Sequence, residues 1–366
     1  MRILHLIHSE GLYGAERILL YLAREQQRLG HAPVIGSIAD PGAPAGALEA
    51  RAAALGLPVL PLRIAPRPTP AVVRRLLAAT AGARPQVLHS HGYKANILLG
   101  FLDRARRGPM LATLHGWTAA PGLSRLRLYE WLDARALRHL EAVVVVARGM
   151  LSLPPLRGVA PQRRHVIENG IPPREERLAE LAQLGVAPPP AALAEFMARA
   201  PTWVAIGRLA PEKGFDLLLR AFARALRAGP PARQLLIVGE GPERARLTQL
   251  IVDLGLGEQA RLAGFLEGAE RLLEHAAGFV MSSHTEGMPL VLLEALQWRR
   301  PLIATAVGAI PELLQQGALG TLVAAGDEAA LARALGAQEL RASAAPPPWS
   351  SRQMAERYLE TYAAIL

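Results

Sequence analysis

The chain has 366 residues, of which 51% are hydrophobic, and it carries a formal net charge of +10 without any cysteine. This length predicts about two domains with sizeable cores, and the lack of cysteine excludes disulfides and thiol chemistry. No apolar run approaches the roughly 18 residues that a membrane span needs, so we expect a cytoplasmic protein.

The positive charge is concentrated in the first half of the chain. Residues 1–170 contain 22 Lys and Arg against 10 Asp and Glu, whereas residues 171–366 contain 19 against 21. The asymmetry favours an anionic partner for the first half, either a membrane surface, a polyphosphate or a nucleic acid. A general preference for arginine is the alternative explanation, because Lys94 and Lys213 are the only lysines.

Short apolar segments alternate with longer helical segments along the chain. The opening "MRILHLIHSEG" is typical of a strand rather than a signal peptide. We expect strands at residues 2–7, 33–38, 87–90, 110–114, 143–146 and 164–167, and helices at residues 14–29, 71–81, 95–105 and 125–139. The alternation restarts at "TWVAIGRL" and continues through "QLLIVGEG", "ARLAGF", "GFVMSS", "PLIATA" and "GTLVAA". Such continuous apolar strands predict parallel sheets with helices on both faces.

Two such sets predict an α/β protein with two Rossmann-like domains. We place the first domain at residues 1–170 and the second at residues 171–349, because "IPPREERLAELAQLGVAPPPAAL" between the sets is rich in proline, alanine and charge. The last segment, residues 350–366, is expected to form a helix that packs on the first domain. Its apolar stripe consists of Met354, Tyr358, Tyr362 and Leu366.

Ligands of open parallel sheets bind at the carboxyl ends of strands, so the candidate residues of the first half follow strands. Gly11 and Gly14 allow the backbone to approach a phosphate, although a plain turn explains them as well. His89 and His91 could ligate a metal, but no carboxylate or cysteine accompanies them, so we expect no metal site. His115 fits a neutral donor to a ligand hydroxyl, whereas His91 fits a hydrogen-bonded loop histidine equally well.

In the second half, Arg208 follows a strand and Lys213 opens the next helix. A guanidinium and an ammonium beside a helix N-terminus would bind a diphosphate, and a solvated surface pair is the alternative. Gly239 and Gly241 make a further turn conformationally permissive, but the third glycine of a dinucleotide-binding fingerprint is missing. No Asp-x-Asp pair is present to hold a metal, so the cations and helix N-termini would have to neutralise the phosphates.

The segment "HTEGMPLVLLEAL" at residues 284–296 separates Glu286 from Glu294 by seven residues. On one continuous helix this pair would be about 80° out of phase. Pro289 instead predicts that the helix begins at the proline, with Glu286 in the preceding loop. Both carboxylates would then border the helix N-terminus, where free N–H groups attract anions.

Together these motifs resemble glycosyltransferase family 4, whose members are retaining enzymes with the GT-B fold. The similarity is strongest from Trp203 to Asp327, and the spacing of the two glutamates resembles the family's E-x7-E signature. Two departures are Tyr13, where the family has a second glycine before Gly14, and Glu168, where proline is common. The segments that carry the resemblance are "YGAERILL", "ATLHGW", "VIENGI", "GRLAPEKGFDLLLRAF", "LLIVGEGPERARL", "GFVMSSHTEGMPLVLLEAL", "PLIATAVGAIPELL" and "GTLVAAGD".

The resemblance implies two Rossmann-like domains that face a central cleft and bind a nucleotide-diphosphate sugar. It implies that Glu294 binds the ribose, Glu286 accepts from sugar hydroxyls, and the loop at Phe265 flanks the base. An acceptor would occupy the first domain, near His91, Tyr93 and Lys94. The implied catalytic residues are Arg208, Lys213, His115 and Glu286, and the implied donor-binding residues are Gly14, Gly239, Phe265, Gly287, Met288, Pro289, Leu290 and Glu294.

The expected function is metal-independent, cofactor-free sugar transfer with retention, to a glycan or lipid-linked acceptor in cell-surface or exopolysaccharide synthesis. The basic first half suggests peripheral binding at the inner face of the membrane. An NDP-sugar epimerase of the same fold is the alternative enzyme, and it would act on UDP-GlcNAc without an acceptor. A basic nucleic-acid-binding protein is the non-enzyme alternative, but no recognisable module supports it, so we expect no nucleic acid. The sequence does not distinguish UDP, GDP and ADP donors.

Overall fold

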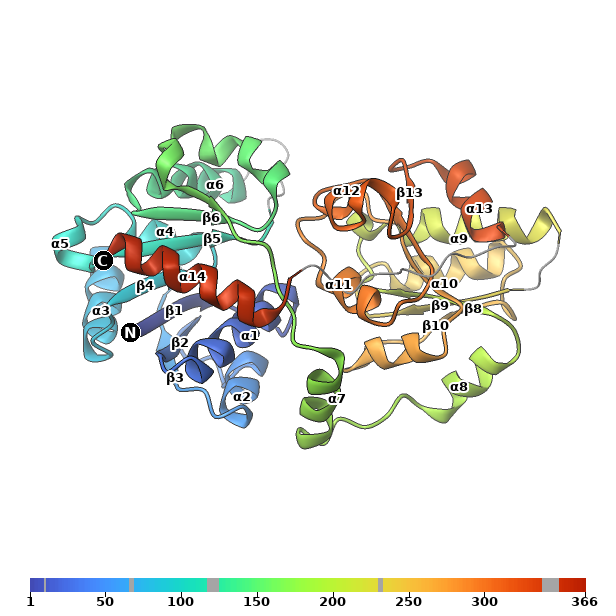
Figure 1. Cartoon of the computed structure of the whole chain (residues 1–366), viewed down its shortest axis with the longest axis horizontal. Helices are drawn as coiled ribbons and strands as arrows, with labels where there is room; N and C mark the ends of the chain where they lie inside the picture. Colours follow the sequence, from blue (N-terminus) through green and yellow to red (C-terminus); the bar gives the residue numbers. More distant parts are fainter. Residues whose placement is uncertain (10, 66–68, 117–124, 230–232, 338–348) are drawn as a thin grey trace. The chain divides into compact units, whose positions relative to one another are not determined.

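The computed structural model describes residues 1–366 except 10, 66–68, 117–124, 230–232 and 338–348 (Figure 1). The chain forms two compact units: unit 1 comprises Met1–Pro172 and Trp349–Leu366, and unit 2 comprises Pro173–Pro348. Each unit contains one parallel β-sheet, which confirms the predicted fold class. None of the described helices combines the length and the apolar character that a bilayer crossing requires.

Unit 1 is built on a seven-stranded sheet with the order β3-β2-β1-β4-β5-β6-β7. The order reverses between β1 and β4, which makes this pair the switch point of the sheet. The strands are β1 (Arg2–His8), β2 (Ala32–Ala39), β3 (Val59–Arg63), β4 (Val87–Ser90), β5 (Met110–Leu114), β6 (Ala142–Val145) and β7 (Arg164–Val166).

The helices of unit 1 include the last helix of the chain, α14, which packs against α1 (Figure 1). They are α1 (Gly14–Arg28), α2 (Ala47–Ala54), α3 (Pro70–Gly82), α4 (Tyr93–Leu99), α5 (Arg104–Arg107), α6 (Arg125–Ala136), α14 (Ser351–Ile365) and the 3-10 turns η1 (Leu137–His139), η2 (Arg148–Ser152), η3 (Pro154–Gly158) and η4 (Pro161–Arg163).

Helix α14 buries the predicted stripe with one exception. Met354, Tyr358 and Tyr362 are buried, but Leu366 is 52% exposed and Ile365 takes the inward position. The prediction for Leu366 was wrong because the helix ends at Ile365. The helix also explains the unusual Glu168, whose buried carboxylate forms an ion pair with Arg357 of α14.

The six strands predicted in the first half lie within one residue of the observed ones, but the predicted helix at residues 95–105 was wrong. The chain forms two short helices there, α4 and α5, because Gly100 ends the first. A Cβ at Gly100 would lie 3.0 Å from the Cβ of Ala136 in α6, so this glycine also permits close packing of the two helices. Strand β3 and helix α2 were missed, and Pro61 interrupts the apolar pattern of β3.

Unit 2 is built on a six-stranded sheet with the order β10-β9-β8-β11-β12-β13. The strands are β8 (Thr202–Ile206), β9 (Gln234–Val238), β10 (Ala260–Leu262), β11 (Gly278–Met281), β12 (Leu302–Thr305) and β13 (Thr321–Val323). The helices are α7 (Arg174–Gln183), α8 (Ala191–Ala198), α9 (Phe215–Arg227), α10 (Arg244–Asp253), α11 (Leu290–Gln297), α12 (Ile310–Leu313), α13 (Glu328–Gly336) and the 3-10 turns η5 (Pro211–Lys213), η6 (Ala269–Glu274) and η7 (Gln315–Gly317).

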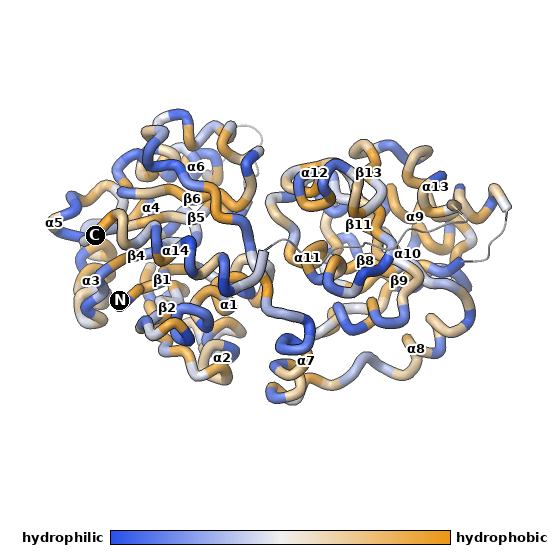
Figure 2. Tube along the Cα trace, viewed as in Figure 1, coloured by the Kyte–Doolittle hydropathy of each residue, from blue (hydrophilic) through white to orange (hydrophobic). Residues whose placement is uncertain are grey.

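The core of each unit lies between its sheet and the helices, and Figure 2 shows the central strands in hydrophobic colours. In unit 2, α9 presents apolar side chains at helical spacing, of which Leu218, Leu219 and Phe222 are buried. They pack in one cluster with Trp203 of β8. The same cluster contains Ala205 and Leu209, so it also holds the carboxyl end of β8, where the candidate residues begin.

Candidate functional site

The candidate residues of unit 2 meet at the switch point of its sheet. The strand order reverses at the neighbouring strands β8 and β11. Arg208 and Lys213 follow β8, and Glu286 follows β11. Open parallel sheets bind ligands at such a switch point. The fold therefore brings the segment with Arg208 and Lys213 and the segment with Glu286 to the edge of the sheet where a ligand is expected.

Backbone contacts hold the loops after β8 and β11 in one geometry. The His284 N–H donates to the carbonyl of Glu212 at 2.8 Å, and the Ser282 hydroxyl donates to the carbonyl of Lys213 at 3.0 Å. Gly214 adopts φ +60, and a Cβ there would lie 2.4 Å from the Ser282 carbonyl oxygen. A glycine is therefore required at this position.

Lys213 and Glu286 form a direct ion pair at this edge. The ammonium Nζ lies 2.6 Å from Oε1 of Glu286, and the Ser283 hydroxyl donates to the same oxygen at 2.6 Å. The side chains of Lys213 and Glu286 are 25% and 9% exposed. The pairing satisfies a largely buried carboxylate, which would otherwise be costly to desolvate.

Arg208 has a different partner. Its guanidinium forms an ion pair of 2.7 Å with Glu212, four residues later, and the two side chains are 56% and 33% exposed. Exposed pairs of this kind contribute about 0–1 kcal/mol to stability. The guanidinium can therefore exchange Glu212 for a ligand phosphate at little cost.

The two glutamates of the signature occupy the loop and the helix that the sequence predicted. Helix α11 begins at Leu290, one residue later than predicted, because Pro289 is extended (φ −72, ψ 117) and serves as the N-cap. Glu286 lies in the preceding loop, and Glu294 lies inside the helix with 5% exposure. A Cβ at Gly308 would lie 2.2 Å from the Glu286 carbonyl oxygen, so the loop rests directly on the backbone after β12.

The stretch from Gly287 to Leu290 turns its side chains inward. Met288 and Leu290 are 6% and 7% exposed, and the carbonyl of Gly287 accepts a hydrogen bond from Ala309 at 2.9 Å. No side chain caps the start of α11. Backbone groups, rather than side chains, are what this stretch can offer to a ligand.

Gly239 and Phe265 extend the edge on the other side of β8. A Cβ at Gly239 would lie 1.9 Å from the carbonyl oxygen of Gly207, and the Gly239 N–H donates to Gly264 at 2.8 Å. Packing therefore requires the glycine, and its N–H is used by the protein. Phe265 follows Gly264 and is 69% exposed. The strands β10, β9, β8 and β11 are neighbours in the sheet. In that order, they are followed by Phe265, Gly239, Lys213 and Glu286.

In unit 1, Gly14 begins α1 after β1, and His91 follows the adjacent strand β4. A Cβ at Gly14 would meet no atom within 4 Å, so packing does not require this glycine. His91 is 6% exposed, and its ring nitrogens bond to His5 and His115 at 3.0 Å each. Both ring nitrogens of His91 therefore have hydrogen-bond partners within the protein.

Tyr93 and Lys94 line an apolar cavity of about 200 Å³ in unit 1. The rings of Tyr93 and Tyr129 stack, with centroids 5.9 Å apart and planes at 26°. The sequence did not identify Tyr129 or Ile38 as site residues, and it missed Ile64 and Ala65 because β3, which they follow, was not predicted. The cavity is lined by Ile38, Ile64, Ala65, Tyr93, Lys94, Ile97, Leu98 and Tyr129.

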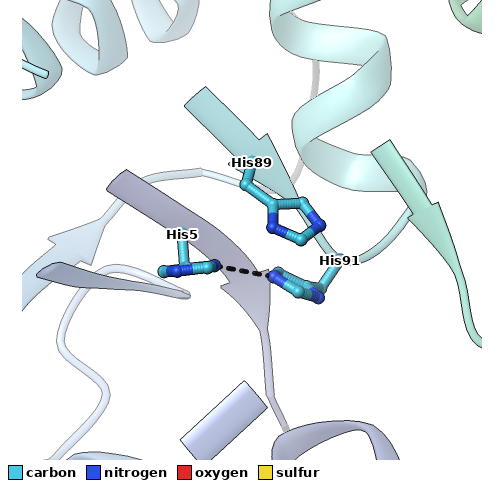
Figure 3. Close-up of side chains that lie close together, drawn as sticks. All are labelled: His5, His89 and His91. Carbon is cyan, nitrogen blue, oxygen red and sulfur yellow. Dashed lines mark hydrogen bonds between the residues drawn. The ribbon is translucent and has the colours of Figure 1, made fainter. Parts of the chain in front are cut away.

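Within the part of the chain that the structure describes, nitrogens of His5, His89 and His91 lie within 4.8 Å of one another (Figure 3). Both nitrogens of each ring already have a hydrogen-bond partner. A metal would have to displace one of these bonds at each ring. His5 was not predicted as a site residue, although a polar residue in the middle of the apolar strand "RILHLIH" was a usable signal.

Two family models match the chain, and both describe glycosyltransferases. "Glycosyltransferase Family 4" matches residues 13–175, and "Glycosyl transferases group 1" matches residues 200–337. The chain therefore belongs to glycosyltransferase family 4 and has the GT-B fold. The NDP-sugar epimerase alternative has no support from these matches.

Relatives of known name are similar to parts of the chain. D-inositol 3-phosphate glycosyltransferase of Nocardia farcinica is 31% identical over 318 residues, covering 76% of this chain and 66% of the relative. Lipopolysaccharide core biosynthesis glycosyltransferase LpsE of Rhizobium meliloti is 33% identical over 138 residues, covering 38% and 39% of the two chains. The matches to three of the curated relatives, LpsE among them, span 39%, 31% and 25% of those proteins' lengths.

Among solved structures, Anabaena HepE in complex with UDP and glucose is similar in fold. Its TM-score is 0.78 at 20% identity, and the match covers 100% of both chains. At this level of identity the likeness concerns the fold.

Proposed function

We propose that this protein is a retaining, metal-independent glycosyltransferase that moves a sugar from a nucleotide-diphosphate donor to a glycan or lipid-linked acceptor. The observation that carries the proposal is the 2.6 Å contact of Lys213 with Glu286, 73 residues away, at the switch point of the unit 2 sheet. A role in cell-surface or exopolysaccharide synthesis is supported by the name of the Rhizobium meliloti relative.

In this proposal, Lys213 and Arg208 bind the donor diphosphate. The Lys213 ammonium has three donors, so it can bind a phosphate oxygen while it keeps its bond to Glu286. Arg208 exchanges its exposed bond to Glu212 for a second phosphate oxygen. Negative charge grows on the diphosphate as it leaves, and fixed cations stabilise that charge.

The remaining donor contacts follow the edge of the sheet. Lys213 and Ser283 both donate to Oε1 of Glu286, so Oε2 is assigned to a hydroxyl of the sugar. Glu294 is assigned to the ribose, and the exposed ring of Phe265 to the base. The backbone at residues 287–290 is assigned to the sugar and phosphate.

Transfer proceeds with attack on the same face as the departing phosphate. The acceptor oxygen forms a bond to the anomeric carbon, the bond to the phosphate oxygen breaks with its electron pair, and that phosphate takes the acceptor proton. Burial lowers the pKa of His115 to about 4, so the ring stays neutral. A neutral ring beside the sugar adds no positive charge at the anomeric carbon, where positive charge develops during transfer. Gly14 is assigned a backbone contact with the donor.

The apolar cavity of unit 1 is assigned to the acceptor. Its aliphatic walls and the stacked Tyr93 and Tyr129 suit an apolar group, and Lys94 suits a negative one. A lipid-linked phosphate combines both properties. Replacing Ile97 by Trp should fill the cavity and raise the KM for a lipid-linked acceptor, while donor binding stays unchanged.

We further propose peripheral binding to the anionic inner face of the cytoplasmic membrane. Helix α6 exposes Leu126, Leu128 and Trp131 by 46%, 56% and 51%, and the Arg135 guanidinium lies 4.0 Å from the Trp131 ring centroid. Apolar side chains mixed with arginine suit an anionic lipid surface. In a flotation assay at low salt, the protein should float with anionic vesicles, and Trp131→Ser should weaken this binding. No binding at low salt would contradict this assignment.

A thermal-shift screen with UDP, GDP and ADP tests the donor class. We expect one nucleotide to raise the Tm, since a ligand at 100 times its Kd stabilises by about 2.7 kcal/mol. The matching sugar nucleotides are then incubated with and without membrane extract, and acceptor-dependent release of the nucleoside diphosphate is expected. Conversion of the sugar nucleotide to an epimer without acceptor would contradict the proposed function.

A further inference from the structure

A chain of hydrogen-bonded imidazoles crosses the centre of unit 1. His5 of β1 lies beside His89 of β4 in the sheet register, and Figure 3 shows the bond from His5 to His91. The His5 Nδ1 lies 3.0 Å from His91 Nε2, and His91 Nδ1 lies 3.0 Å from His115 Nε2. The chain therefore runs from the middle of the sheet to the carboxyl end of β5.

Gln26 of α1 terminates this chain at its inner end. Its Oε1 lies 2.8 Å from His5 Nε2, and its Nε2 donates to the Tyr362 hydroxyl at 3.2 Å. Gln26, His5 and Tyr362 are all 0% exposed. Because a carbonyl oxygen can only accept, His5 carries its proton on Nε2.

The polarity then propagates ring by ring. Desolvation by burial lowers the pKa of His5 to about 4 and that of His91 well below 6.5, so the rings are neutral near pH 7. A neutral His5 protonated on Nε2 accepts at Nδ1, so His91 donates from its Nε2. His91 in turn accepts at Nδ1 from the Nε2 of His115. The His115 Nδ1 is left as an unprotonated lone pair.

A second branch starts from the same amide. The Tyr362 hydroxyl accepts from Gln26 and lies 2.7 Å from His89 Nδ1, to which it donates. His89 then donates from Nε2 to the Thr113 hydroxyl at 2.8 Å. All four imidazoles thus share the same tautomer, and Gln26 sets it in both branches.

The outer end of the chain points to a ligand. The Nδ1 of His115 is buried and has no hydrogen-bond partner among the described residues. The opposite polarity would leave an N–H there, and buried orphan N–H groups are rarer than unsatisfied acceptors. A ligand group can satisfy a buried polar atom that has no partner among the described residues.

We propose that Gln26 fixes one proton polarity through His5 and His91, and that His115 thereby accepts, at Nδ1, a hydrogen bond from a hydroxyl of the transferred sugar. The second clause rests on the proposed function. Gln26, His5 and His91 are positioning residues in this assignment. The polarity reverses the donor role that the sequence suggested for His115.

Long-range ¹H–¹⁵N spectra of the full-length protein, labelled with ¹⁵N-histidine, test the polarity without any substrate. We expect His5, His89, His91 and His115 to be protonated at Nε2 and to remain neutral from pH 8 to pH 6. A proton on Nδ1 of His115 would overturn the proposal, as would a ring that titrates near pH 6.5. One equivalent of bound zinc after addition of ZnCl₂, with loss of the Nε2–H signals, would also overturn it.

Addition of ligand tests the contact with the sugar. UDP-glucose, or the sugar nucleotide that the thermal-shift screen selects, should move the ¹⁵N signal of His115 Nδ1, whereas the nucleoside diphosphate without sugar should leave it unchanged. An unchanged signal with a bound sugar nucleotide overturns the hydroxyl contact. If no sugar nucleotide binds, the proposed function fails, while the tautomer spectra still decide the polarity.

Matched variants separate positioning from packing. Gln26→Leu removes the group that sets the polarity, so the spectra should show mixed tautomers at His5 and His115. Tyr358→Phe is the control, because it removes a buried hydroxyl that lies 2.9 Å from Thr113 and outside the path to His115. A single unchanged tautomer in a folded Gln26→Leu would overturn the proposal. If that variant does not fold, the spectra of the unmodified protein decide.

Discussion

Replacing Lys213 by methionine removes the ammonium and keeps a side chain of similar length. Glu286, which is 9% exposed, then retains the Ser283 hydroxyl but loses its ion pair. Hydrogen bonds to charged groups contribute about 1.5–3 kcal/mol to the free energy of unfolding. Because Lys213 is partly exposed, the stability lost with its ion pair should lie near the lower end of this range. We expect the free energy of unfolding to fall by about 1–2 kcal/mol.

The effect of Lys213→Met on transfer should be larger than its effect on stability. Removing one group that stabilises charge in the transition state typically lowers kcat by about 10²–10³-fold. Stability is measured by urea unfolding, and transfer is measured as acceptor-dependent release of the nucleoside diphosphate. The double variant with Glu286→Gln removes the unpaired charge, so it should recover stability without recovering transfer.

The control is Arg220→Met on α9, which removes an ion pair of the same length, 2.6 Å to Asp216. Since this pair is exposed, the change in stability should stay below about 1 kcal/mol, with transfer unaffected. If Lys213→Met loses stability but transfers sugar within threefold of the unmodified protein, the pair with Glu286 has only a structural role and the reasoning is refuted.

Gly239→Ala should destabilise unit 2 by at least about 2 kcal/mol, because the new Cβ would lie 1.9 Å from a backbone carbonyl oxygen. Gly14→Ala meets no atom within 4 Å, so it should leave the Tm unchanged while weakening donor binding. Burial lowers the pKa of His5 and His115 to about 4 from 6.5. The free energy of unfolding therefore keeps its full value above pH 6.5 as far as these rings are concerned. It falls as the pH falls from 6.5 toward 4, by about 3 kcal/mol per ring, because the unfolded chain binds the protons first. Asp133 opposes this trend, because burial raises its pKa to about 6.

Each of these expectations has a direct check. Thermal unfolding compares the two glycine variants, and equal Tm values for both would contradict the packing argument. Urea unfolding from pH 7.5 to pH 5 should show falling stability, and His5→Phe should flatten the slope. A slope of the opposite sign would mean that the imidazoles are charged in the folded chain.

The fold was predictable because continuous apolar strands alternate with helices in both halves of the chain. The β4 and β5 strands were predicted residue for residue, since their apolar runs are bounded by polar or turn residues. Strand β3 was not predicted, because Pro61 breaks its pattern, and the pattern of residues 95–105 did not show that Gly100 ends α4.

The site was predictable in part. The spacing of Glu286 and Glu294 around Pro289 placed one carboxylate in a loop and one in a helix, as observed. The ion pair of Lys213 with Glu286 depends on the adjacency of β8 and β11, which follows from strand order rather than from any local pattern. The histidine chain likewise depends on sheet register and on a residue of α1.

The configuration of the first sugar released from a sugar nucleotide tests the central claim most directly, and it requires no knowledge of the acceptor. The α-linked donor selected by thermal shift is incubated with the protein, and ¹H NMR follows the anomeric signal before mutarotation. Same-face displacement from a diphosphate bound at Lys213 predicts the α anomer and its loss in Lys213→Met. Initial formation of the β anomer, or release unaffected by the substitution, would contradict the account.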